Sequence, residues 1–328
     1  MPNFKGSLLL LLLAAAPGRG ADFSQSAIGT TGSEFLNIGV DPRGMAMGSA
    51  YTAVTNDAYS MYWNPAGLSM IPRSSLGAMH TEYVAGIRMQ YVTYAQRITD
   101  TSVVGGAFRY MDAGGITQRD INGNDTGTFR PRNYVYEMGW GQSITDMTDA
   151  ERDISLGVVG RYFYTDMVSH ASGFAGDLGI QAHFTEAYIP YNFGVALQNM
   201  GTGQKFDSVR DSLPFMARLG AAIRPKPALL LSLDGSFPSS NMPFASLGAE
   251  VTLETQKRLK LFLRAGYNSR NQFSGLDGLR GFTLGTGATA GDFSFDYAFI
   301  PFGVLGDTHR FSVSWNLPPK QSRRYRQR

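Results

Sequence analysis

The chain has 328 residues, of which 39 are glycine, 12% are aromatic, 17% are charged and none is cysteine. This length is ample for one large all-β domain, and the absence of cysteine excludes a disulfide scaffold and a cysteine-ligated metal site. The formal net charge of +3 is too small to indicate nucleic-acid binding.

The first residues have the pattern of a secretory signal peptide. Lys5 supplies a positive start, residues 8–16 are an unbroken apolar run, and small residues follow. The run is too short to cross a bilayer as a helix. We expect residues 1–20 to be removed by cleavage after Gly20 rather than after Ala16; a retained anchor is the alternative. No later run approaches the roughly 18 apolar residues that a transmembrane helix needs.

Residues 21–73 show no alternating pattern, and the stretch from Phe35 to Met70 is rich in Gly, Ala, Met and Asn. Such a segment is either a periplasmic extension or a plug inside a barrel. Small residues allow backbones to approach closely, and methionines fill irregular gaps. We favour a plug, because a barrel of about 14 strands is wider than the roughly eight-stranded barrels whose own side chains fill the interior.

Residues 74–317 alternate apolar and polar positions over runs of roughly ten residues, which is typical of strands between lipid and a polar lumen. For example, the aromatic residues at 293, 295, 297 and 299 alternate with Ser294 and Asp296. We count about 14 such runs. They begin near residues 75, 87, 102, 132, 154, 173, 191, 214, 227, 244, 258, 279, 292 and 308.

The predicted fold is therefore an all-β, transmembrane outer-membrane β-barrel of about 14 antiparallel strands with an N-terminal lumen plug. A soluble β-sandwich or barrel would have shorter strands and more Lys and Glu on its exposed face. An even strand number places both chain ends on the periplasmic side.

The polar positions of these runs predict charges that face the lumen. Both signs occur, so they either pair within a filled lumen or select a solute; buried charges must pair. The predicted lumen charges are Arg88, Arg109, Arg161, Asp177, Glu250, Arg264 and Asp296.

The sequence predicts no enzyme, cofactor or metal site. The four histidines are widely separated, and no pair has the spacing of metal ligands. No nucleotide-binding fingerprint is present, and no Ser-His pair is joined by sequence to a third catalytic group.

The N-terminal stretch carries a family resemblance. Asp41-Pro42-Arg43-Gly44-Met45-Ala46-Met47-Gly48, Asn56-Asp57-Ala58 and Trp63-Asn64-Pro65-Ala66-Gly67-Leu68 resemble the opening of PorV/PorQ-like outer-membrane proteins of the FadL-type β-barrel superfamily. The Asn-Pro-Ala element resembles one in the hatch of FadL-type transporters. The resemblance implies a plug motif made of Arg43, Gly44, Met47, Gly48, Asp57, Asn64, Pro65 and Ala66.

The resemblance also implies a location and a role. The protein is expected in the outer membrane of a diderm bacterium, handling or shuttling secreted-protein cargo in a manner similar to type IX secretion. Its partners would be outer-membrane lipid and either secreted-protein signal domains or secretion-system components. The alternative is FadL-type passive transport of a hydrophobic small molecule. Residues 318–328 form a basic tail, which we expect in the periplasm because two prolines end the last strand.

Overall fold

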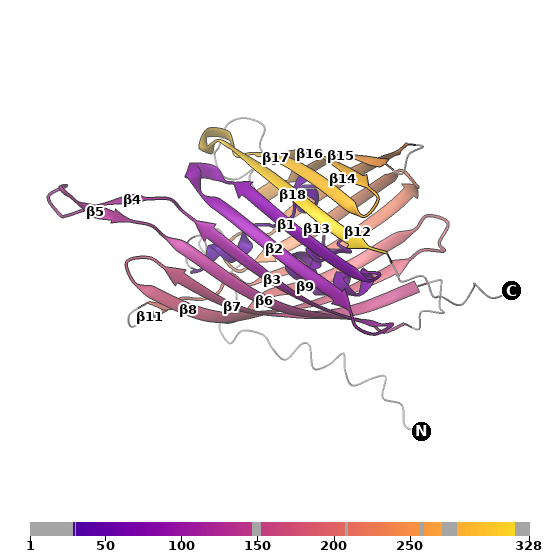
Figure 1. Ribbon diagram of the computed structural model, residues 1–328, viewed down its shortest axis with the longest axis horizontal. Helices are drawn as coiled ribbons and strands as arrows, with labels where there is room; N and C mark the ends of the chain where they lie inside the picture. The colour runs from indigo at the N-terminus through magenta and orange to yellow at the C-terminus, as the bar shows by residue number, and fades with distance from the viewer. Residues whose placement is uncertain are drawn as a thin grey trace, which may run out of the picture.

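The computed structural model describes residue 29 and residues 31–145, 152–206, 209–255, 259–270 and 281–318. Within these residues, fourteen antiparallel strands close into a barrel, as predicted (Figure 1). The predicted signal peptide and almost all of the basic tail lie outside the described residues, so both stay predictions.

The barrel strands follow one another around the wall, and the last strand pairs with the first. Each begins within three residues of its predicted position. They are β1 (Ser74–Glu82), β2 (Arg88–Arg97), β3 (Ser102–Asp112), β6 (Arg132–Ser143), β7 (Arg152–Asp166), β8 (His170–Phe184), β9 (Tyr191–Thr202), β12 (Met216–Lys226), β13 (Leu229–Pro238), β14 (Phe244–Glu254), β15 (Leu259–Asn268), β16 (Phe282–Ala290), β17 (Phe293–Pro301) and β18 (Asp307–Leu317).

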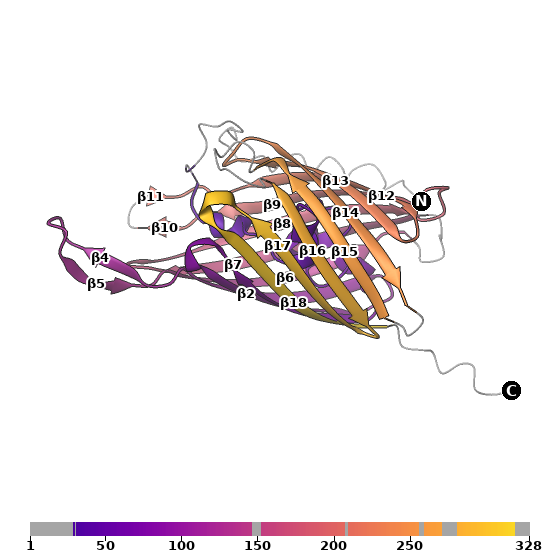
Figure 2. The same ribbon diagram turned by 90° about the horizontal axis from the view of Figure 1, so that it is seen from above.

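The two ends of the barrel differ in their connections. Ser74 of β1 pairs with Leu317 of β18, so the barrel wall begins and ends at the same rim. Tight turns such as that between β12 and β13 lie at this rim, which makes it the periplasmic end. The opposite, outer end carries two additional hairpins, β4 (Ile116–Arg119) with β5 (Asp125–Phe129), and β10 (Lys205–Phe206) with β11 (Val209–Arg210). The β4–β5 hairpin projects far beyond the rim (Figures 1 and 2).

The outward face of the wall is apolar. Every barrel strand has at least one large hydrophobic side chain that is exposed to the outside, such as Val92, Met138, Phe174, Leu233 and Phe293. A soluble protein rarely exposes so much contiguous apolar surface, whereas lipid requires it. No helix among the described residues is long and apolar enough to cross a membrane.

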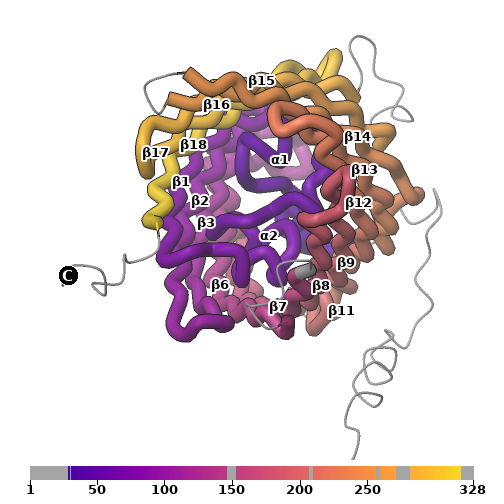
Figure 3. Tube along the Cα trace, turned by 90° about the vertical axis from the view of Figure 1, so that its right-hand side faces the viewer, coloured from indigo at the N-terminus to yellow at the C-terminus, as the bar shows by residue number. Residues whose placement is uncertain are grey.

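The N-terminal segment occupies the lumen, where Figure 3 shows α1 and α2 enclosed by the ring of strands. It consists of the short helices η3 (Glu34–Asn37), α1 (Pro42–Ala46), α2 (Ser60–Trp63) and η4 (Pro65–Met70). Two further single turns, η5 (Val84–Gly86) and η7 (Gly303–Leu305), lie in outer connections. We refer to residues 31–73 as the plug. Its helices are too short to be stable alone, so they depend on packing against the wall.

Candidate functional site

The first α-helix of the plug, α1, is capped by the side chain of the residue that precedes it. The Asp41 carboxylate accepts hydrogen bonds from the backbone N–H groups of Arg43 (3.0 Å) and Gly44 (3.2 Å). Pro42 stands at the first helical position, where its missing N–H costs nothing. This cap aims the side chain of Arg43 at the barrel wall.

Arg43 joins the plug to a charged network on the wall. Its guanidinium donates from Nε (2.7 Å) and Nη2 (2.8 Å) to the two carboxylate oxygens of Glu250 on β14. Glu250 also accepts from Arg264 Nε (2.7 Å), and Arg264 donates to Asp296 (2.6 Å). A bidentate arginine–carboxylate pair fixes geometry as well as charge. The network thus holds α1 in one position against β14, β15 and β17.

A second charged network lies on β3, β6, β7 and β8. Glu137 pairs with Arg109 (3.1 Å) and with Arg161 (3.4 Å), and Arg161 pairs with Asp177 (2.5 Å). All four side chains are buried. Arg161 also donates to the carbonyl oxygen of Met61 in the plug (3.1 Å). These wall charges therefore pair with one another and with plug carbonyls.

The Asn-Pro-Ala element fastens the second half of the plug. The Asn64 amide donates from Nδ2 to the carbonyls of Thr52 (2.9 Å) and Ile180 (3.0 Å), and its Oδ1 accepts from the N–H of Ala66 (3.2 Å). Asn64 is the N-cap of η4, and Pro65 follows at its first position. One side chain therefore connects two plug segments to β8.

Glycines in the wall leave the room that this element occupies. A Cβ at Gly157 would lie 2.1 Å from the carbonyl carbon of Pro65, and one at Gly179 would lie 2.0 Å from Asn64 Oδ1. Within the plug, Gly48 has φ +66° and a Cβ there would lie 2.6 Å from the backbone nitrogen of Tyr267. The absence of a side chain at Gly157 and Gly179 in the wall, and at Gly48 in the plug, permits these close contacts.

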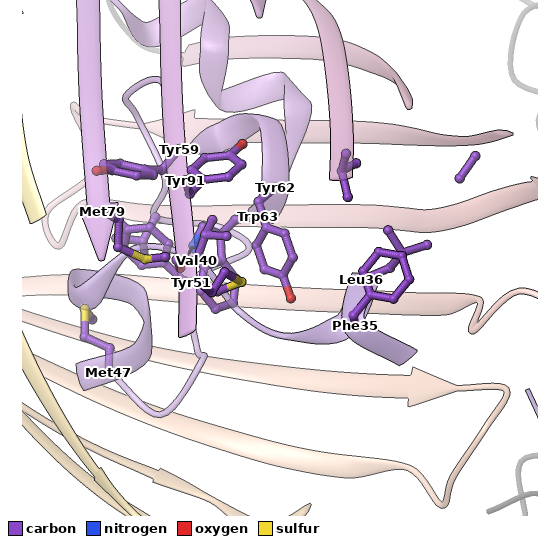
Figure 4. Close-up of a cluster of buried hydrophobic side chains, with 14 of the residues drawn as sticks. Phe35, Leu36, Val40, Met47, Tyr51, Tyr59, Tyr62, Trp63, Met79 and Tyr91 are labelled. Atoms are coloured by element: carbon purple, nitrogen blue, oxygen red, sulfur yellow. Dashed lines mark hydrogen bonds between the residues drawn. The ribbon is translucent and has the colours of Figure 1, made fainter. Parts of the chain in front are cut away.

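Aromatic packing fills the rest of the interface between plug and wall. Trp63 meets Tyr51 edge-on at 5.6 Å and Tyr62 at 5.0 Å, and its Nε1 donates to the carbonyl of Val40 (3.1 Å). Tyr59 stacks on Tyr91 of β2 at 6.0 Å (Figure 4). The buried cluster is continuous from the plug into the wall. The plug is therefore packed like a protein core.

The predicted plug-motif residues separate into three groups. Arg43, Asn64, Pro65 and Ala66 make the contacts given above. Gly44 and Gly48 allow close packing, and Met47 is fully buried. Asp57 caps a turn by accepting from the N–H of Tyr59 (2.9 Å).

One predicted lumen charge lies elsewhere, so that prediction is wrong. Arg88 is 61% exposed on the outward side of β2, 3.4 Å from Glu82, whereas Met89 and Tyr91 face the plug. The lumen beside β2 is filled by apolar plug side chains, so polarity does not mark the inward face of that strand. The other predicted lumen charges are buried inside the barrel; they are Arg109, Arg161, Asp177, Glu250, Arg264 and Asp296.

Sequence reasoning missed several groups that also hold the plug, and Arg97 and Gln181 are two of them. Arg97 donates to the carbonyls of Ile71 (2.8 Å) and Ser69 from the end of β2. Gln181 donates to the carbonyls of Thr52 (3.0 Å) and Thr55 (3.2 Å). The strand period places Gln181 inward, but a neutral side chain carries no signal that it will bind backbone.

Burial perturbs two acids of the plug. Loss of water around Asp41, together with the neighbouring carboxylates of Asp57 and Asp296, raises the pKa of Asp41 to about 8. Burial likewise raises the pKa of Asp57 to about 6, although Arg43 opposes the shift. Both acids lie in the plug, so the plug contains groups that titrate near neutral pH.

Cavities lie on both sides of the plug. The outer one has a volume of about 430 Å³ and reaches from Phe35 and Trp63 in the plug to Tyr83 and Phe302 in the outer connections. Two inner cavities, of about 390 and 320 Å³, share Arg43, Asn56 and Met70 in their walls. In the described residues, no cluster of three or more His, Asp and Glu side chains has an arrangement that could hold a metal ion.

Several solved structures share the fold of this chain. The toluene transporter TbuX of Ralstonia pickettii has a TM-score of 0.54 at 12% identity, over 84% of this chain and 97% of that one. The CymD monoaromatic hydrocarbon channel has a TM-score of 0.55 at 10% identity, over 87% and 99%. A Pseudomonas aeruginosa FadL homologue has a TM-score of 0.51 at 8% identity, over 84% and 98%. Identities this low establish the fold alone.

No curated protein sequence matches the chain. A family model does match it, described as type IX secretion system protein PorV and covering residues 21–224. The matched part contains the plug, both hairpins and the wall through most of β12. Because it is more than half of the sequence, this chain belongs to the PorV family of type IX secretion proteins and is an outer-membrane β-barrel with the fold of FadL-type channels.

Proposed function

We propose that this protein binds secreted-protein cargo at the outer surface of the outer membrane and passes it on within type IX secretion, without catalysing a reaction. The observation that supports this proposal most directly is that the plug fills the lumen. The plug is held on one side by Glu250, which binds Arg43 of the plug, and on the other by Arg161 and by the carbonyl of Ile180, which accepts from Asn64 of the plug. A polypeptide cannot cross a barrel filled in this way, so the surfaces left for a protein partner are the barrel ends.

The outer end has the features of a docking surface. The β4–β5 hairpin projects beyond the rim with Ile121 fully exposed at its tip. Val168 in the β7–β8 connection and Val304 in η7 are also largely exposed. Exposed apolar side chains outside the lipid-facing wall are typical of protein interaction sites. The partner expected from the family resemblance is the signal domain of an exported protein.

Site-specific photo-crosslinking in secreting cells tests this proposal. A photoreactive residue replaces Ile121 at the hairpin tip; the control replaces Tyr188, which is equally exposed in the periplasmic turn between β8 and β9. We expect secreted proteins to crosslink at position 121 and not at position 188. Crosslinking of secreted proteins at position 188 alone, or at neither position, would contradict the proposal.

A second candidate function is passive transport of a small hydrophobic molecule. The outer cavity of about 430 Å³ has the size of a ligand pocket, and the fold is that of the toluene transporter TbuX. Transport requires the plug to move, because the plug separates the outer cavity from the two inner cavities. Mass spectrometry of lipids and small molecules that copurify with the protein checks this. A stoichiometric apolar ligand supports transport, and its absence in preparations that retain secreted cargo excludes it.

We also propose the division of the chain into a signal peptide (1–20), a plug segment (21–73), a barrel (74–317) and a basic periplasmic tail (318–328). The start of β1 at Ser74 supports the boundary between the plug segment and the barrel. N-terminal sequencing of protein from outer membranes tests the boundary between the signal peptide and the plug segment. A mature chain that begins at residue 21 is expected, and one that retains residue 1 contradicts it.

A further inference from the structure

The larger of the two inner cavities lies between the plug and the last four strands of the wall. Its volume is about 390 Å³, and its lining comes from the plug and from β15, β16, β17 and β18. Asn56 and Asp57 of the plug line it on one side, and Asp296 and Asn316 of the wall line it on the other. Asn316 is one residue from the end of β18 at the periplasmic rim, so this cavity lies at the periplasmic end of the lumen.

The acids and bases around this cavity do not all pair. Glu250 accepts from both Arg43 and Arg264, and Arg264 also pairs with Asp296. These contacts use the two arginines and two of the carboxylates. Within the described residues, no basic side chain lies within ion-pair distance of Asp57, although Arg43 acts on it electrostatically. Asp57 is therefore the acid that lacks a bonded counter-charge.

Asp57 is partly buried and carries its charge at neutral pH. Burial raises its pKa to about 6, which still leaves the carboxylate mainly ionised at pH 7. Its Oδ1 accepts a hydrogen bond from the backbone N–H of Tyr59 (2.9 Å). A partly buried charge without a bonded counter-charge is unfavourable, and a cation in the cavity would relieve that cost.

The chain itself supplies cations beside this cavity. Residues 320–328 contain five basic side chains and no acid. The chain leaves the wall at Leu317, directly after Asn316 in the cavity lining. Six residues of extended chain span at most about 20 Å, so Arg323 can reach back into the cavity from Leu317. Tethering gives such a segment an effective concentration in the millimolar range, so a weak pair is sufficient.

The smaller inner cavity, of about 320 Å³, has a different charge. The charged and titratable side chains in its lining, within the described part of the chain, are Arg43, His183 and Arg224, and no acid is among them. A basic segment would be repelled there. We propose that the basic tail folds back into the larger inner cavity, where one of its arginines pairs with Asp57 and covers the plug on its periplasmic side.

The absence of cysteine permits a direct test on the purified full-length protein. Asn56 is exposed and lines the larger inner cavity, so Asn56→Cys places a single thiol next to Asp57. N-ethylmaleimide carries no charge, and the rate at which it alkylates this thiol reports whether the tail covers the site. The rate is compared between the natural tail and a neutral tail, in which Lys320, Arg323, Arg324, Arg326 and Arg328 are all replaced by Gln.

We expect the neutral tail to raise the alkylation rate on the order of threefold or more, because a tethered ligand occupies its site for most of the time. In an Asp57→Asn background, the neutral tail should have no effect. This variant keeps an oxygen that accepts the N–H of Tyr59 and removes only the charge. Heat-modifiable migration shows that each variant still forms the barrel.

The matched control is Asp100→Asn, in the exposed turn between β2 and β3 at the same rim. It should leave the effect of the neutral tail unchanged. Loss of the effect in this control would show a general attraction of the tail to the rim and would overturn the proposal.

Two further results would also overturn it. The first is no increase in the alkylation rate with the neutral tail, which would assign the tail to solvent or to lipid head groups. The second is a tail effect that persists in Asp57→Asn, because pairing with Asp57 would then not be its cause. The test is independent of the crosslinking experiment, since it needs no secretion partner.

Discussion

Glu250 connects the plug to the wall through two arginines, so its removal leaves Arg43 and Arg264 buried without their shared counter-charge. We predict that Glu250→Ala lowers the free energy of unfolding by about 3–5 kcal/mol, the usual cost of breaking a buried ion pair from one side. Urea unfolding of the protein in detergent micelles measures the change.

The matched control lies on the same strand. Glu254 pairs with Lys260 at 2.6 Å, but its side chain is 65% exposed. Glu254→Ala should cost no more than about 1 kcal/mol, as is usual for exposed pairs. Equal losses in the two variants would show that the Arg43–Glu250 pair does not hold the plug.

Asp41 gives the plug a predicted pH dependence. Burial raises its pKa from 3.8 to about 8, so the folded state holds a proton that the unfolded chain releases. The associated stability is present below about pH 4 and is lost as pH rises through about 8. Asp41→Asn keeps a capping side chain without a titrating group. We expect this variant to unfold with a flatter pH profile between pH 4 and 9 than the parent; identical profiles would exclude Asp41 as the cause.

At the scale of elements, the wall strand β7 tests how closely the plug is fitted. A Cβ at Gly157 meets Pro65 at 2.1 Å, whereas a Cβ at Gly160 has no heavy atom within 4 Å. We predict that Gly157→Ala displaces η4, costs about 1–3 kcal/mol through overpacking, and speeds hydrogen exchange in residues 60–70. Gly160→Ala, on the outward side, should leave exchange unchanged. Similar exchange in both variants would mean that the plug is loosely held at this place.

The barrel strands were predictable because lipid on one side and a filled lumen on the other impose a strict period of two. The outer hairpins were not predicted. The β4 residues are exposed on both faces, so no burial pattern marks that strand. Arg88 shows a similar limit for single residues. Where the plug and the lipid are both apolar, as on the two sides of β2, the alternation of polar and apolar residues cannot distinguish the inner face of a strand from the outer face.

The site was predictable to a different extent. The sequence indicated which residues carry the plug motif, since Asn64-Pro65-Ala66 is a turn pattern set by local backbone chemistry and can be recognised without knowing its contacts. It could not indicate that Asn64 bonds to Ile180 or that Arg43 reaches Glu250, because those pairs are 116 and 207 residues apart. Such contacts depend on strand order and on the lumen's width.

For the whole molecule, the central claim is that the plug stays in the lumen while the protein works from its outer end. Ser69 of the plug and Ser155 of β7 place their Oγ atoms 2.6 Å apart, and the chain has no cysteine of its own. Ser69→Cys with Ser155→Cys should therefore form a single disulfide that ties η4 to the wall.

The decisive measurement is the crosslinking of secreted proteins from position 121 in this double-cysteine protein, compared between the oxidised and the reduced form. The account predicts equal yields, because a tied plug leaves the outer end unchanged. Crosslinking that occurs only after reduction would contradict it, since it would show that the plug must move for the protein to engage its cargo.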